Sequence, residues 1–314
     1  EFQFARGMVA QVKAAYQRPP NIPSWFSEML PLSFDLAIEI GKFRKLMEGR
    51  FRKKENKKEI IDFINSYLYV DKNGANAIYE YFKDQFNYVG EIPHNRKILI
   101  EHYEDEHGKK IIFHSLFGRR VNDVLSRALA FAISRTQHRD VEVGISDNGF
   151  YLSAEKTIYP RKAFDMLRSE KIDLVMKNAI DNSEVLKRRF RHCASRAFMI
   201  LRNYKGKTKR VGRQQVSSML LISAVRRIDE NFSILKEARR EVLEDLMDID
   251  NAKQILKDIE DEKIVVKEIH TKIPTPFAFN LALAGYIDVL KIEEKVEFLR
   301  RMHNMVKAKI GLGK

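Results

Sequence analysis

The chain has 314 residues, a formal net charge of +14 and a pI near 9.6, with 44% hydrophobic and 10% aromatic residues. This composition excludes a disordered basic tail, because it supplies enough apolar area for the cores of two or three modules. No run approaches the length of a transmembrane helix, and no signal-peptide core opens the chain, so we expect no membrane partner and a cytoplasmic location. The positive charge predicts an acidic partner, and the single cysteine, Cys193, on an apolar helix stripe, is typical of a core thiol in a reducing compartment.

The first 32 residues are expected to be irregular, because four prolines interrupt regular structure: Pro19, Pro20, Pro23 and Pro31. This stretch carries the only tryptophan, Trp25. It is either an anchor to a neighbouring module or a stacking platform for an unpaired base. The first residues read like the interior of a larger protein, and we interpret the chain as part of one.

Three helices are expected next. Ser33 is a suitable N-cap for the first, which would end near Gly49, and further helices are expected over 57–69 and 74–88. Residues 42–58 hold nine Lys or Arg and two acids, which forms a second basic patch.

From Arg96 the hydrophobic period changes to two, which predicts strands over 97–104 and 109–116 and a second hairpin over 140–154. A helix is predicted between the hairpins, over 119–135. The order strand, strand, helix, strand, strand predicts an α+β module, an antiparallel sheet with a helix on one face.

Little in the chain indicates catalysis or metal binding. Three histidines fall in the first hairpin, where alternation favours exposed side chains over a metal site: His102, His107 and His114. Asp140 and Glu142 share a strand face, but no Lys follows at nuclease spacing. No glycine-rich turn precedes a Lys-Ser or Lys-Thr pair, so we expect no nucleotide triphosphate site.

Residues 160–262 are predicted to be helical, and they contain the most basic stretch of the chain. Residues 182–227 hold thirteen Lys or Arg and a single acid, Glu184. From Ser183 an apolar stripe recurs at three- and four-residue steps: Leu186, Phe190, Cys193, Ala194, Ala197 and Leu201. Arg189, His192 and Arg196 lie on one flank, and Arg188 and Arg191 lie on another.

This basic helix is either a solvated face or a polyanion-binding surface. A solvated face normally alternates both signs, whereas unopposed cations gain free energy from counterion release on nucleic acid. Residues 234–262 carry ten acids and five bases. These acids either pack beside the basic region or repel nucleic acid from the wrong side.

Another candidate anion site lies at the start of the helix expected over 119–135. Arg119 and Arg120 follow the Gly118 turn there, and a helix N-terminus with two arginines attracts phosphate. Solubilising charge at a turn is the alternative. A last strand is possible at residues 263–269, and a final helix is expected over 292–307.

Several segments resemble the large helicase-related (Lhr) family of superfamily 2 helicases, in its DEAD/H-associated region after the two motor domains. The segments occur in the family's order at residues 23–44, 113–130, 190–202 and 275–285. The resemblance implies an ATP-dependent parent helicase that moves 3′ to 5′ and acts in DNA repair, and the Lys- and Glu-rich composition fits an archaeal source. ATP and Mg²⁺ would bind the parent, and no cofactor is expected in this part.

The resemblance also implies partners: single-stranded DNA or an RNA:DNA hybrid, and the motor domains of the same chain. Trp25 would stack on the tracking strand that this accessory domain grips. We predict three parts, 1–90 with a Pro-rich segment and helices, 91–158 with the sheet, and 159–314, mostly helical and basic. The predicted nucleic-acid-binding residues are Trp25, Arg119, Arg120, Arg188, Arg189, Arg191, Arg196 and Arg202. The alternatives are a protein-interaction module for an acidic partner, and base excision, for which no convincing catalytic pair is present.

Overall fold

The structure is a computed structural model that describes residues 2–6, 9–14, 30–105, 108–201, 203–208, 211–284 and 292–312. Its internal contacts separate a short unit, Glu1–Leu30, from a large one, Pro31–Lys314. The short unit contains an antiparallel hairpin of β1 (Phe2–Arg6) and β2 (Val9–Val12), so the expectation of irregular structure is wrong there. The four prolines follow the hairpin in sequence and do not interrupt it.

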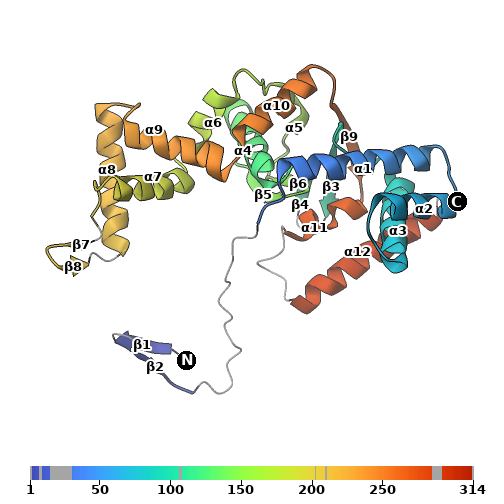
Figure 1. The fold of residues 1–314 in the computed structure, drawn as a ribbon, viewed down its shortest axis with the longest axis horizontal. Helices are drawn as coiled ribbons and strands as arrows, with labels where there is room; N and C mark the ends of the chain where they lie inside the picture. Colours follow the sequence, from blue (N-terminus) through green and yellow to red (C-terminus); the bar gives the residue numbers. More distant parts are fainter. Residues whose placement is uncertain are drawn as a thin grey trace. The chain divides into compact units, whose positions relative to one another are not determined.

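The large unit has an α+β fold, as predicted (Figure 1). Its strands are β3 (Lys97–Asp105), β4 (Gly108–His114), β5 (Glu142–Ser146), β6 (Gly149–Ser153), β7 (Asn203–Tyr204), β8 (Lys207–Thr208) and β9 (Val265–Thr271). Its α-helices are α1 (Phe34–Arg52), α2 (Lys57–Tyr67), α3 (Lys72–Val89), α4 (Arg119–Gln137), α5 (Pro160–Asp165), α6 (Ile172–Ile180), α7 (Glu184–Arg196), α8 (Val211–Ile228), α9 (Ser233–Arg240), α10 (Ile249–Glu260), α11 (Phe279–Ala284) and α12 (Ile292–Leu312). A π-helix, η1 (Glu241–Leu246), and a 3-10 helix, η2 (Pro276–Ala278), complete the described elements.

The central sheet has the strand order β5-β6-β4-β3-β9. Neighbouring strands are antiparallel except β3 and β9, which are parallel with Lys97 opposite Val265. The possible last strand is therefore confirmed. It joins the same sheet as the two predicted hairpins, although about 150 residues separate β3 from β9 in sequence.

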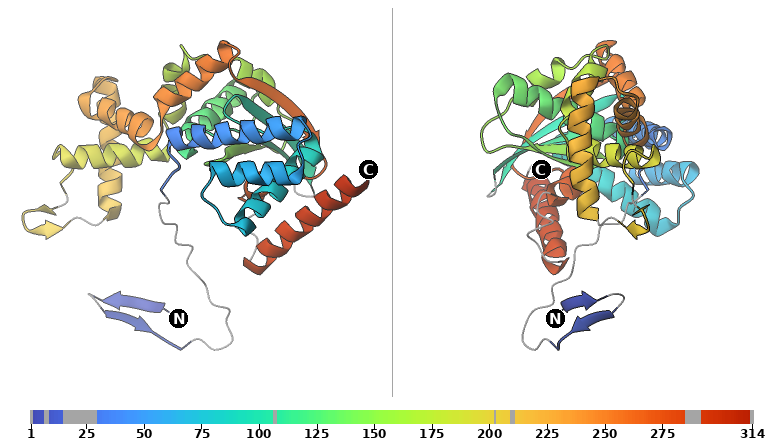
Figure 2. Two further views of the ribbon diagram at one scale, coloured as in Figure 1. Left: turned by 45° about the vertical axis from the view of Figure 1, so that its right-hand side comes forward. Right: turned by 90° about the vertical axis from the view of Figure 1, so that its left-hand side faces the viewer.

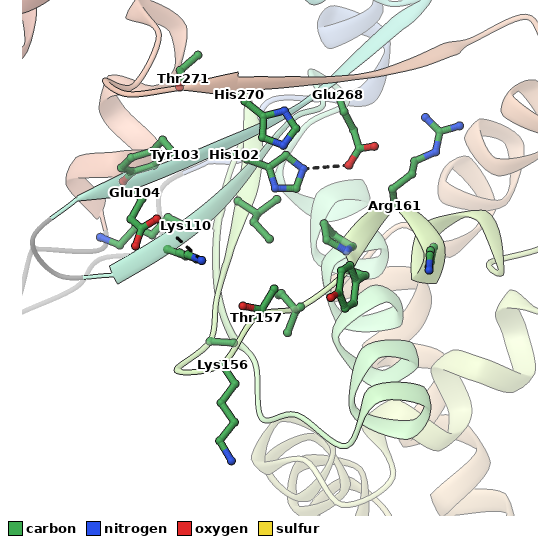
Figure 3. A pocket seen from close by; sticks show the side chains of 17 residues that line it. His102, Tyr103, Glu104, Lys110, Lys156, Thr157, Arg161, Glu268, His270 and Thr271 are labelled. Carbon is green, nitrogen blue, oxygen red and sulfur yellow. Dashed lines mark hydrogen bonds and ion pairs between the residues drawn. The ribbon is translucent and has the colours of Figure 1, made fainter.

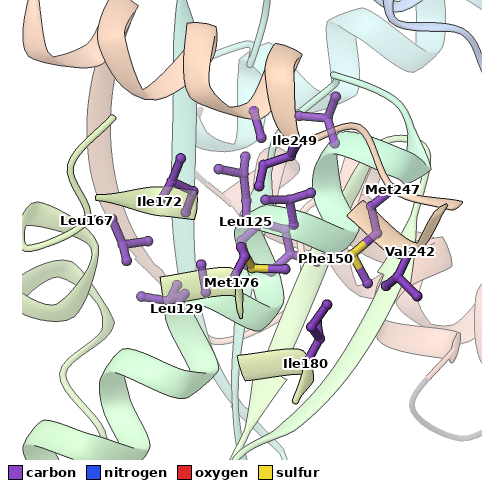
Figure 4. Packing of buried hydrophobic residues seen from close by; sticks show 14 of the residues in the cluster. Leu125, Leu129, Phe150, Leu167, Ile172, Met176, Ile180, Val242, Met247 and Ile249 are labelled. Atoms are coloured by element: carbon purple, nitrogen blue, oxygen red, sulfur yellow. The ribbon is translucent and has the colours of Figure 1, made fainter. Parts of the chain in front are cut away.

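Helices and turns cover both faces of this sheet. One face packs on α4, α6 and α10 through a large apolar core, part of which Figure 4 shows around Leu125, Phe150 and Met176. The other face carries Tyr103 and Ile112 and packs on η2 and α11 through Leu281. A helix on only one face was expected, and the second layer comes from the TPFAF turn far along the chain.

The three-helix group over residues 34–89 is confirmed. Ser33 caps α1 by accepting a hydrogen bond from Leu36 N at 3.3 Å. Gly49 does not end this helix, because Phe51 continues it and stacks on Phe86 of α3 at 5.5 Å between ring centroids. Figure 2 shows α12 beside α3, and Lys307 Nζ lies 2.6 Å from Asp84 Oδ1 between them.

The exposure expected for the hairpin histidines is wrong for His114, which is only 3% exposed. Its Nε2 lies 2.7 Å from Glu101 Oε2, and Glu101 also accepts hydrogen bonds from Thr271 Oγ1 and from Thr275 N and Oγ1. This buried network fastens the turn before η2 to the sheet. His107 lies outside the described residues, and His102 is half-buried.

Candidate nucleic-acid interface

The basic helix α7 forms where the sequence predicts it, and its apolar stripe is buried. Ser183 caps it by accepting from Leu186 N at 3.3 Å. The buried positions are Leu186, Phe190, Cys193 and Ala194. The helix ends at Arg196, so Ala197 is exposed and does not extend the stripe. Burial raises the pKa of the Cys193 thiol, and the nearby Glu241 carboxylate adds to this.

One flank of α7 is neutralised from within the molecule. Glu241 of η1 is 5% exposed on its side chain, and Arg189 Nη1 lies 3.4 Å from its Oε2. Arg196 Nη2 also donates to Glu241, at Oε1, and to Cys193 Sγ at 3.2 Å. At Glu241, the acidic segment therefore packs beside the basic helix, which resolves the alternative that the sequence left open.

The other flank of α7 carries arginines with no partner. Arg188 and Arg191 have no hydrogen bond or ion pair within the described ranges. They line a notch of about 240 Å³ between α7 and α8, to which α8 contributes Gln215 and Ser218. Figure 2 shows these two helices crossing. The predicted separation of Arg188 and Arg191 from Arg189 and Arg196 is confirmed.

Lys187 and Glu184 also line this notch, and their side chains pair at 2.7 Å. The notch therefore presents two unopposed guanidinium groups beside an internally neutral pair. Guanidinium forks bind phosphate in a bidentate way, and the amide and hydroxyl side chains of Gln215 and Ser218 are further groups that hydrogen-bond phosphate oxygens. The α8 residues had no signal in the sequence, because the charge pattern drew attention to cations alone.

Arg119 and Arg120 are placed differently. The N-terminus of α4 already receives an anion, because Asp147 Oδ1 accepts from Arg119 N at 3.0 Å. Arg120 Nη2 donates to the carbonyls of Glu244 and Met247 at 2.5 and 2.9 Å. The Arg119 side chain is exposed, whereas the Arg120 guanidinium fastens α4 to the end of η1.

Two predicted site residues, Trp25 and Arg202, lie outside the described residues, and their roles stay predictions. The second basic patch is partly neutralised by carboxylates. Arg50 pairs with Glu55 at 2.5 Å, and Lys57 pairs with Glu80 at 2.9 Å. This patch is therefore a weaker anion surface than its sequence suggests.

Exposed apolar side chains lie beside the notch. Val216, Met219 and Leu220 of α8 are 58, 56 and 68% exposed, and Met219 lines the notch itself. Phe198, just after α7, is 79% exposed. Three- and four-residue steps place the α8 residues on one face, which is an apolar surface next to a cationic one.

Over the described ranges, no three or more His, Cys, Asp or Glu side chains gather in a way that could hold a metal ion. A search of the same residues finds no helix with the length and hydrophobicity needed to span a bilayer.

Comparisons with known proteins match most of the chain. A family model described as DEAD/H associated matches residues 92–278. The chain is 53% identical over 306 residues to the ATP-dependent helicase Lhr-Core of Methanothermobacter thermautotrophicus, covering 97% of this chain and 35% of that protein. It is 42% identical over 313 residues to the Saccharolobus solfataricus protein of the same name, covering 98% and 36%.

A solved structure, the helicase Lhr of Mycobacterium smegmatis bound to ssDNA and AMP-PNP, is similar with a TM-score of 0.71. The sequences are 22% identical, and the match covers 84% of this chain and 33% of that one, so the similarity establishes the fold alone. The chain spans about a third of the length of the curated relatives it matches.

Proposed function

Because the chain belongs to the DEAD/H-associated family of Lhr-type helicases, we propose that it is the part of an ATP-dependent helicase that grips single-stranded nucleic acid. The observation that carries this proposal is the notch between α7 and α8, where Arg188 and Arg191 lack an anionic partner. Phosphate oxygens of a strand would supply that partner, with Gln215 and Ser218 as further hydrogen-bonding groups. Such contacts fix a strand in position without reading its sequence.

The rest of the parent protein supplies the chemistry in this proposal. No glycine-rich turn precedes a Lys-Ser or Lys-Thr pair in this chain, so its residues do not fit a triphosphate and Mg²⁺ site. ATP and Mg²⁺ would bind the motor domains, which relatives of about three times this length have room to contain. The strand would be single-stranded DNA or the displaced part of an RNA:DNA hybrid, moved 3′ to 5′.

The test is fluorescence anisotropy of this chain with a labelled single strand, titrated across salt concentration. Each phosphate neutralised by a cation contributes a slope of about −0.7 to log K against log salt. We expect a steep salt dependence and similar affinity for strands of different sequence. No binding at low salt would refute the proposal.

A second candidate function rests on the exposed apolar residues of α8. Val216 and Leu220 beside cationic arginines would also suit an acidic, partly apolar protein partner. Competition separates the two functions. Poly-glutamate should displace a strand poorly if bases stack on the chain, and should displace it as well as nucleic acid does if the surface recognises acidic protein.

A further inference from the structure

The largest described pocket lies away from the α7–α8 notch and has a volume of about 630 Å³. Its floor is the sheet, through His102 of β3, Ile111 of β4 and His270 of β9 (Figure 3). Its wall is the segment 154–162, which leads from β6 into α5. The volume falls within the range of small-molecule and cofactor sites.

Two imidazoles form a flat platform on this floor. His102 and His270 stack with ring centroids 4.7 Å apart and planes 7° from parallel. His102 Nε2 is fixed by Glu268 Oε1 at 2.9 Å. His270 lies on β9 at the edge of the sheet, and its exposed side chain leaves one ring face for a further planar group.

Aromatic and apolar groups line the wall, with cations at its rim. Tyr159 is 58% exposed, and Lys162 Nζ lies 5.4 Å from its ring centroid. Lys156 is exposed and has no partner within the described ranges, and Figure 3 shows it extending from the rim farthest from the histidines. Arg161 is already bound, because its Nε donates to Asp165 and its Nη1 to Val266 O.

Charge at this pocket favours an anion with a ring. The lining contains four lysines and one arginine against two glutamates, Glu104 and Glu268. Planar heterocycles stack on histidine and tyrosine in nucleic-acid sites, and lysines bind phosphate as point charges. A nucleotide combines both groups, since its base is planar and its phosphate is anionic.

We propose that this pocket binds one nucleotide unit, with the base on the free face of His270 and the phosphate near Lys156 and Lys162. The unit is either a free nucleotide or one unpaired nucleotide of a strand. The proposal concerns binding alone and is independent of the α7–α8 notch, because the two sites share no residue.

The experiment titrates the whole chain by calorimetry with three probes: AMP, adenosine and inorganic phosphate. AMP should bind more tightly than either other probe, because only AMP contacts both platform and rim. His270→Ala should weaken AMP about tenfold, the scale of one lost stacking contact. Lys156→Gln should weaken AMP severalfold and leave adenosine unchanged.

Matched controls use exposed residues elsewhere in the chain. His303→Ala on α12 and Lys236→Gln on α9 should leave AMP affinity unchanged. Thermal unfolding should show that all four variants fold, since each altered side chain is exposed. No AMP binding at millimolar concentration would overturn the proposal, as would AMP binding that His270→Ala does not affect.

The source of the nucleotide follows from adding a labelled strand. If AMP displaces the strand, and His270→Ala weakens strand binding, the unit belongs to the strand. If AMP binds and the strand is unaffected, the pocket takes a free nucleotide. AMP binding without any strand binding would support the pocket and refute the proposed function, so the two failures are distinguishable.

Discussion

Arg189 Nη1 lies 3.4 Å from Oε2 of Glu241, a carboxylate buried beside α7. This contact separates Arg189 from its neighbour Arg188, which has no partner within the described ranges. Adjacent positions on a helix point about 100° apart, so two consecutive arginines reach different surroundings. The basic charge of residues 182–227 is therefore divided between an internal role and a surface role.

The first prediction concerns the two arginines of the notch. Arg188→Gln and Arg191→Gln should each weaken single-strand binding for every strand sequence, because phosphates carry no sequence information. Each substitution should also reduce the magnitude of the salt slope by about 0.7, the value for one phosphate contact on a single strand. Anisotropy titrations at four or more salt concentrations measure both effects.

Arg189→Gln is the matched control, because the same change is made one residue away. It should leave the salt slope unchanged and reduce the free energy of unfolding by about 1 kcal/mol, since it removes a hydrogen bond to a buried charge. Equal losses of strand affinity for Arg188→Gln and Arg189→Gln would show that binding follows total charge and that the notch has no special part.

The second prediction concerns Trp25, the only tryptophan and the proposed base-stacking residue. Trp25→Ala should weaken single-strand binding by about 1 to 3 kcal/mol, the range for one stacked base. Because the chain has a single tryptophan, quenching of its fluorescence by a strand reports directly on this contact. Unchanged affinity together with unquenched fluorescence would remove Trp25 from the site.

Local sequence patterns predicted the elements that local forces specify. The three- and four-residue period and the Ser183 cap identified α7, and the period of two identified the four strands of both hairpins. Gly49 misled, because contacts between Phe51 and Phe86 hold α1 together beyond it. The intrinsic cost of a helical glycine, about 1 kcal/mol, is smaller than such packing.

Partners distant in sequence could not be predicted. Glu241 neutralises Arg189 from 52 residues away, and Thr275 reaches Glu101 from 174 residues away. The sequence shows that cations and acids are present in excess in two segments, but it does not show which of them meet. That is why the flanks of α7 were predicted correctly, while the division between bound and unbound arginines required the structure.

The third prediction concerns Gly118, at the turn into α4. Its φ of 84° is unfavourable for other residues, and an added Cβ would lie 2.5 Å from the Leu32 carbonyl oxygen. Gly118→Ala should therefore lower the free energy of unfolding by about 1 to 3 kcal/mol. Urea unfolding measures this, with Gly49→Ala as the control.

Gly49 lies inside α1, and a Cβ there meets nothing within 4 Å. Gly49→Ala should stabilise the chain by up to about 1 kcal/mol, through helix propensity. The opposite sign of the two effects tests the backbone argument. A Gly118→Ala variant as stable as the unmodified chain would show that the turn relaxes without cost.

The last prediction concerns Glu48 of α1, whose side chain is 7% exposed. Lys97 Nζ lies 2.5 and 2.7 Å from its two carboxylate oxygens, and Arg52 Nη2 lies 3.0 Å from Oε1. Ile92 N also donates to it at 3.2 Å, and His94 Nε2 lies 3.3 Å from Oε2. This one carboxylate therefore ties α1 to the start of β3 and the segment before it.

Burial alone would raise the pKa of Glu48, but the hydrogen bonds from His94, Lys97 and Ile92 N and the charge of Lys97 outweigh it and lower the pKa well below its ordinary 4.5. A carboxyl whose pKa is lowered by folding stabilises the folded chain above its unfolded pKa. That contribution is present at neutral pH and is lost progressively as pH falls below about 4.5. Glu48→Gln should cost about 3 kcal/mol at pH 7, because it leaves Lys97 partly unpaired in a buried site.

The pH dependence distinguishes this charge from ordinary packing. Urea unfolding at pH 7, 5, 4 and 3 should show the difference between Glu48→Gln and the unmodified chain shrinking below pH 4.5. Glu39→Gln is the control, because Glu39 lies on the same helix and pairs with Lys42 in an exposed ion pair. It should cost less than about 0.5 kcal/mol. A Glu48→Gln difference that stays constant from pH 7 to pH 3 would mean that shape, and not the lowered pKa, sets the contribution of this residue.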